Sequence, residues 1–164
     1  MPQSSHAVKF RSIPHRRRPV TGPVRLTRLR KWGVYSIGIG IWASGVLWLG
    51  LHYFLRQKSE FGLETNPAEP WMLKLHGAFA FAALVGLGLL WGVHILNGWF
   101  SDRRRWSGGI VFGLACFLAL SGYLLYYAGD DGFRDVVSVS HWAVGVAAIG
   151  FFLWHRFWAE RGRS

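Results

Sequence analysis

Residues 32–55, WGVYSIGIGIWASGVLWLGLHYFL, contain no Asp, Glu, Lys or Arg. A helix rises ~1.5 Å per residue, so about 20 apolar residues cross the ~30 Å hydrocarbon core of a bilayer. Equally apolar blocks lie at 71–99, with Lys74 near its start, at 108–127 and at 136–155. None alternates with the two-residue period of a membrane β-strand. The sequence therefore predicts an all-α membrane protein, a four-transmembrane-helix bundle with spans at about 32–55, 71–99, 108–127 and 136–157.

The positions of the tryptophans support this class, and the single cysteine excludes two kinds of covalent linkage. Five tryptophans flank the apolar blocks, where amphipathic rings are expected at the level of the lipid headgroups. Cys116 is the only cysteine, so no internal disulfide forms. The sequence also has no C-x-x-C-H run, which excludes the usual covalent attachment of a c-type haem. The flanking tryptophans are Trp32, Trp71, Trp99, Trp106 and Trp158.

The distribution of charge predicts the orientation. With four spans, both termini and the second loop share one side, which carries fifteen Lys and Arg against two acidic residues. The opposite side carries four basic residues against six acidic ones. The positive-inside rule therefore places both termini in the cytoplasm.

The same charge count explains the basic pI of about 10.9. Residues 1–31 are expected to form a basic cytoplasmic tail, poorly ordered to about residue 24, and residues 159–164 a short cytoplasmic tail. Juxtamembrane Lys and Arg are the usual counterpart of anionic lipid, so we prefer membrane lipid to nucleic acid as the partner of the tail. The long basic region and the spanning length of the first apolar block do not fit a secretory signal peptide.

Five of the seven histidines lie in or at the edge of a predicted span. Ionisable residues inside a membrane span are costly and mark functional sites, although contact with headgroups is the better explanation for any one of these histidines taken singly. Spans two and four run in the same direction, and each carries one histidine near either face. The five are His52, His76, His94, His141 and His155.

This arrangement predicts two bis-histidine sites. If spans two and four pack together, His76 meets His141 at the outer face and His94 meets His155 at the inner face. His76 and His94 are 18 residues apart, which is five whole turns, whereas His141 and His155 are 14 apart, a drift of about 40°. On each span the two histidines therefore share a helix face.

The outer pair has two candidate compositions. Eighteen residues cover ~27 Å but 14 cover ~21 Å, so His76 overshoots His141 by ~6 Å unless span two is tilted or kinked near its glycines. His52, near the outer end of span one, is the alternative partner of His141, with His76 beside it as a proton or quinone ligand. Both compositions stay open.

Haem fits these histidines better than zinc does. Imidazole binds zinc, copper and haem iron, but a closed zinc site uses four ligands, usually with Cys or carboxylate, and the spans offer few of either. Haem needs two axial histidines and an apolar slot. Glycines on spans two and four allow a flat ring, or equally a neighbouring helix, to approach. The cofactor prediction is two haem b groups, or one, with iron bound by His94, His155, His141 and either His76 or His52.

Three segments resemble a known family: EPWMLKLHGAFAFAALVGLGLLWGVHI (69–95), RRRWSGGIVFGLACFLALSGYLLYY (103–127) and SVSHWAVGVAAIGFFLWH (138–155). They are similar to small bacterial four-helix membrane proteins, a domain of unknown function related to di-haem cytochrome b and cytochrome b561. The resemblance covers roughly residues 32–158. It implies a haem-binding electron-transfer module in the bacterial inner membrane, and the 18-residue interval from His76 to His94 departs from its pattern.

The leading hypothesis is a di-haem b-type cytochrome that passes electrons between the quinone pool and a periplasmic or cytoplasmic redox protein. It would act as an electron-transfer subunit, in a homo- or hetero-oligomer, rather than as a stand-alone oxidoreductase. One alternative is an accessory or assembly subunit without haem, and another is a periplasmic-side copper or zinc site at His52, His76 and His141. Tyr123, Tyr126 and Tyr127 line a quinone site or anchor the interface. No nucleophile–base pair or phosphate-binding loop supports hydrolysis.

Overall fold

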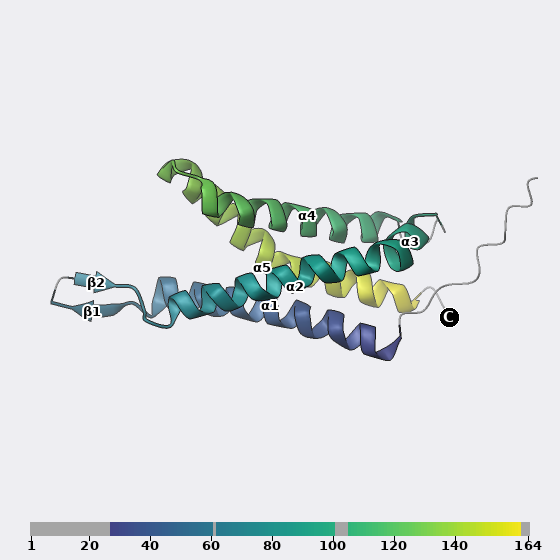
Figure 1. The fold of residues 1–164 in the computed structure, drawn as a ribbon, viewed down its shortest axis with the longest axis horizontal. Coiled ribbons are helices and arrows are strands. Elements are labelled where there is room, and N and C mark those ends of the chain that lie inside the picture. The colour runs from purple at the N-terminus through teal and green to yellow at the C-terminus, as the bar shows by residue number, and fades with distance from the viewer. Residues whose placement is uncertain (1–26, 61, 101–104, 162–164) are drawn as a thin grey trace, which may run out of the picture.

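The computed structural model describes residues 27–60, 62–100 and 105–161 (Figure 1). Most of the predicted basic tail and residues 162–164 lie outside these ranges. Four helices are long and apolar enough to cross a membrane, which confirms the predicted helical class. The long helices are α1 (Arg28–Phe54), α2 (Glu69–Leu90), α4 (Arg105–Tyr127) and α5 (Asp131–Arg161). The short elements are β1 (Gln57–Ser59), β2 (Gly62–Glu64), the π-helical turn η1 (Trp91–Ile95) and α3 (Leu96–Phe100).

Polar caps start two helices several residues before the predicted spans. Thr27 Oγ1 accepts a bond from the Arg30 amide at 3.4 Å, so α1 begins at Arg28 instead of near residue 32. Asp130 accepts a bond from the Phe133 amide at 2.7 Å, so α5 begins at Asp131 instead of near residue 136. Side-chain oxygens in these positions satisfy amides that have no partner within the helix.

The second predicted span is not one uninterrupted α-helix. It runs as α2 to Leu90, then as the single π-helical turn η1, which contains Gly92 and His94, and then as α3. A π-helical turn inserts an extra residue and often marks a functional position. Pairing of His76 with His141 required this span to be tilted or kinked near its glycines, and the structure has an irregularity at Trp91–Ile95.

The long helices pack as two antiparallel pairs, α1 against α2 and α4 against α5, and α5 also contacts α1 (Figure 1). A Cβ added at Gly40 of α1 would overlap the ring of Phe79 of α2, so the first pair packs closely because residue 40 has no side chain. The two pairs are joined by the contact between α1 and α5. It includes a hydrogen bond of 2.8 Å from Arg156 Nε to the Tyr35 hydroxyl, and the Tyr35 ring meets Phe152 edge to face.

The two strands form a short antiparallel hairpin that pairs Gln57 with Glu64 and extends from one end of the bundle (Figure 1). Gly62 adopts a φ of 119°, which side-chain-bearing residues rarely adopt. The hairpin lies at the same end as the α4–α5 connection, and α3 lies at the other end.

Burial is inverted relative to a water-soluble protein. Among the described residues, the three most buried side chains with hydrogen-bonding groups are Ser44, Ser107 and Ser121, at 2–5% exposure, whereas Val137 at 9% is the one apolar residue classed as buried. Large apolar side chains such as Phe81 and Leu89 are more than 70% exposed. This distribution suits a lipid environment, where exposed apolar groups cost nothing and polar groups must find partners inside the bundle.

Candidate functional site

His76 of α2 and His141 of α5 lie next to each other. Their ring centroids are 6.3 Å apart and their planes are nearly perpendicular, at 81°. Both side chains are partly buried. Of the two candidate partners for His141, the structure therefore places His76 beside it, and the side chains come from the two different helix pairs.

The His76 ring is held by α1. Its Nδ1 lies 2.9 Å from the backbone oxygen of Ile41 and 3.2 Å from Ser44 Oγ. A Cβ at Gly45 would lie only 3.1 Å from the Cε1 atom of the ring. The dipeptide Ser44-Gly45 thus supplies a polar contact for one edge of the imidazole and the space that the ring occupies.

The His141 ring is held in the same way by α4. Its Nδ1 lies 2.8 Å from Ser121 Oγ, and a Cβ at Gly122 would lie 3.3 Å from its Cε1. At the other end of the same helix pair, His155 Nδ1 lies 2.9 Å from Ser107 Oγ, and Gly108 lies against its ring. Three histidines therefore each face a Ser-Gly dipeptide on the neighbouring antiparallel helix.

The sequence interpretation missed these serines. The signal was present, because Ser-Gly occurs at 44–45 and 121–122 inside apolar blocks and at 107–108 at the start of one. A serine in a membrane helix commonly donates its hydroxyl to a backbone oxygen one turn earlier in the same helix. The sequence therefore does not show that these three serines also contact histidines, which depends on how the helices pair.

His52 is engaged elsewhere. Its Nδ1 lies 2.7 Å from Glu69 Oε1 in an ion-pair geometry, and its ring stacks on Trp48 with centroids 4.8 Å apart. Glu69 begins α2 beside Pro70 and was not singled out from the sequence. The contact joins the end of α1 to the start of α2, where the hairpin connects them.

His94 lies in the π-helical turn η1 and has an exposed side chain. Its predicted pairing with His155 stays a prediction. A π-helical turn rises less per residue than an α-helix, so it shortens the axial distance between His76 and His94. This reduces the ~6 Å by which that distance exceeds the one between His141 and His155.

Within the described residues, no group of three or more His, Cys, Asp and Glu side chains is placed to hold a metal ion. The three-histidine copper or zinc site at His52, His76 and His141 is therefore not assembled here. Two-ligand coordination, as in a bis-histidine haem, does not require such a group.

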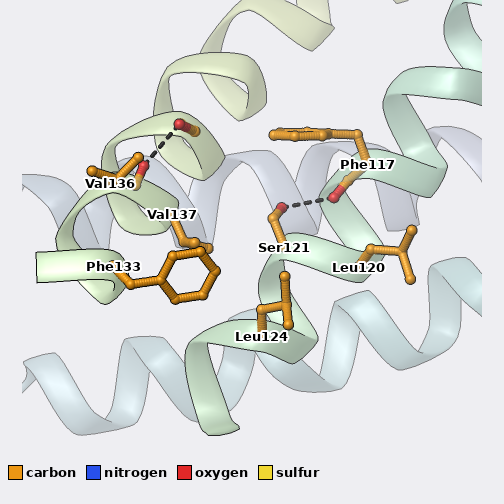
Figure 2. Close-up of a pocket in the computed structure, with 8 residues that line it drawn as sticks. Phe117, Leu120, Ser121, Leu124, Phe133, Val136 and Val137 are labelled. Atoms are coloured by element: carbon orange, nitrogen blue, oxygen red, sulfur yellow. Dashed lines mark hydrogen bonds between the residues drawn. The ribbon is translucent and has the colours of Figure 1, made fainter. Parts of the chain in front are cut away.

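A groove of about 280 Å³ runs between α4 and α5 next to this site (Figure 2). Phe117, Leu120 and Leu124 of α4 line it opposite Phe133 and Val137 of α5, and Ser121 lies between them with its hydroxyl bonded to the Phe117 oxygen. The groove is apolar, so Ser121 turns its hydrogen-bonding capacity toward the helix backbone and His141.

The three tyrosines suggested for a quinone site lie at the end of α4. The Tyr123 and Tyr127 rings contact each other, with centroids 4.6 Å apart. A Cβ at Gly77 would lie 4.0 Å from the Tyr126 hydroxyl, which places that hydroxyl one residue from His76. All three rings are well exposed, as interface anchors are.

Comparison of the chain with protein-family models, curated proteins and solved structures finds no match.

Proposed function

We propose that this protein is a di-haem b-type cytochrome-like electron-transfer protein of the bacterial inner membrane, working between the quinone pool and a redox partner. The observation that supports it is the juxtaposition of His76 and His141 with the Nδ1 of each ring engaged by a neighbouring helix. Histidine ligands characteristically donate their second ring N–H to an oxygen acceptor, which orients the ring and makes the ligating nitrogen more basic.

The distance between the two rings fits a shared iron ion. With nitrogen–metal bonds of about 2 Å, and each ring centre about 1 Å beyond its nitrogen, two imidazoles that bound one metal ion from opposite sides would have centroids about 6 Å apart. The observed separation is 6.3 Å. His76 and His141 would hold the outer haem and His94 and His155 the inner one, and the haems would supply one-electron redox chemistry.

A buried polar atom on α5 is also without a partner. Trp142 Nε1, beside His141 in the chain, is buried without a hydrogen-bond partner among the described residues. A buried indole N–H without an acceptor is unfavourable, so an acceptor from a bound group or a partner would stabilise it.

The test is an optical difference spectrum combined with a haem count. Protein expressed with ample haem should give b-type bands in the dithionite-reduced minus oxidised spectrum and about two extractable haems per chain, one for each bis-histidine pair. A colourless preparation would reject the proposal in favour of an accessory subunit, which should then purify with a membrane partner.

The proposed orientation has both termini in the cytoplasm. It rests on the excess of Lys and Arg on the side of the termini and the second loop. In a Cys116→Ala background, a Thr65→Cys variant at the exposed hairpin end should react in spheroplasts with a maleimide that does not cross membranes. A cysteine placed at Ser164 should react only after lysis, and the reverse pattern would invert the topology.

A further inference from the structure

We propose that Ser121 is a positioning residue that fixes which nitrogen of His141 carries the proton, and that Ser44 does not do so for His76. The inference concerns the tautomers of the two histidines, and its functional meaning rests on the proposed function. It follows from which oxygen atoms can accept the hydroxyl hydrogen of each serine and the Nδ1 proton of each histidine.

The Ser121 hydroxyl has one hydrogen to donate. Its Oγ lies 2.7 Å from the Phe117 oxygen, the carbonyl one turn earlier in α4, and 3.3 Å from the Leu118 oxygen (Figure 2). Ser121 donates that hydrogen to the Phe117 oxygen, which is the nearer of the two, because a carbonyl oxygen can only accept a hydrogen bond. Toward His141, Ser121 Oγ therefore acts as an acceptor, and the ring nitrogen at 2.8 Å must carry the proton.

A neutral imidazole has one N–H, so a proton on Nδ1 leaves Nε2 with its lone pair. This is the tautomer that a ligand bound through Nε2 requires. Among the described contacts of His141, the bond to Ser121 is the one that selects it. The serine thus fixes both the ring orientation and the nitrogen that can bind a metal.

His76 is fixed differently. Its Nδ1 lies 2.9 Å from the Ile41 backbone oxygen, which can only accept, so the Nδ1 proton is required whatever Ser44 does. The Ser44 hydroxyl is donated to the Gly40 oxygen at 2.7 Å, and its 3.2 Å approach to Nδ1 is the longer of the two contacts of that nitrogen. Removing the Ser44 hydroxyl leaves the selecting acceptor in place.

The structure supplies a matched control in Ser140. Its hydroxyl bonds to the Val136 oxygen at 2.7 Å, one turn earlier in α5, as Ser121 does in α4. It lies next to His141 in the sequence and also lines the groove between α4 and α5. Ser140→Ala therefore removes the same type of intrahelical bond near the same histidine, without removing the bond to its ring.

The experiment compares Ser121→Ala, Ser44→Ala and Ser140→Ala in the full chain. Haem-containing protein is titrated for haem dissociation and for carbon monoxide binding by the reduced form. Ser121→Ala should weaken binding of one haem by about 10-fold or more and open that haem to carbon monoxide, because second-shell partners of metal ligands contribute about 10–100-fold to affinity. Ser140→Ala should behave as wild type, and Ser44→Ala should weaken haem binding less than Ser121→Ala does, because the Ile41 oxygen still accepts the Nδ1 proton of His76.

If the purified chain contains no haem, the proposed function fails but the inference is still tested. Nitrogen-15 spectra of histidine-labelled protein distinguish the two neutral tautomers directly. Wild type, Ser44→Ala and Ser140→Ala should show the Nδ1–H form at His141, and Ser121→Ala should lose it. Equal effects of Ser121→Ala and Ser140→Ala, or a larger effect of Ser44→Ala, would overturn the inference in either sample.

Discussion

Replacing His141 with alanine should remove one of two haems and about half of the b-type absorbance, because an iron with one remaining axial histidine loses much of its binding free energy. His76→Ala should remove the same haem, since the two rings lie 6.3 Å apart. The measurement is the pyridine haemochrome count per chain together with the reduced minus oxidised spectrum.

The double variant distinguishes a shared site from two separate ones. If both histidines bind one iron, His76→Ala combined with His141→Ala keeps the second haem, because effects within one site are not additive. If each ligates a different haem, the double variant loses both. His52→Ala is the matched control and should keep both haems, because His52 is bound to Glu69. A loss of haem in His52→Ala equal to that in His76→Ala would contradict the assignment of the outer pair.

His155→Ala should remove the other haem, the one that the sequence assigns to His94 and His155. Retention of both haems in this variant would break the proposed inner pair. The result would also decide whether His94, in its π-helical turn, has a ligand role.

Replacing Gly40 with leucine should destabilise the protein by about 1–3 kcal/mol, the usual cost of forcing extra atoms into a packed contact. Even the first added carbon overlaps the ring of Phe79, so that ring must move or α1 and α2 must separate. The measurement is the midpoint of unfolding in detergent with increasing SDS.

Gly38 is the control for this substitution. It lies two residues away on α1, and a Cβ there meets no atom within 4 Å. Gly38→Leu carries the same loss of backbone flexibility and the same added hydrophobicity, without the contact with Phe79. Equal destabilisation by the two variants would show that helix packing at Gly40 is not the cause.

The four helices could be predicted because each needs only a long block without charge, and residues 32–55 and 108–127 satisfy this plainly. The helices begin at Arg28 and Asp131, before the predicted spans, because hydropathy does not register the caps at Thr27 and Asp130. The π-helical turn at Trp91–Ile95 was also beyond reach, since glycines near a site predict an irregularity but not its type.

The proximity of His76 and His141 was one of two alternatives from the sequence, whereas the surroundings of the two rings were not predicted. Spacing alone left His52 and His76 as alternative partners for His141. The rise per residue gives the depth of each histidine along its helix, but it does not show which helices pack side by side. The choice depends on contacts between residues far apart in sequence, including the bond of His52 to Glu69. The three serines escaped notice for the same reason.

The division of the bundle into two helix pairs has a consequence for biogenesis. His76 belongs to the α1–α2 pair and His141 to the α4–α5 pair, and each ring is already held within its own pair, by Ile41 and by Ser121. Each pair can therefore enter the bilayer with its histidine already oriented, and His76 meets His141 when the pairs dock. Two fragments divided between α3 and α4, made as separate chains, should bind haem together and not singly, so that pigment formation reports their association.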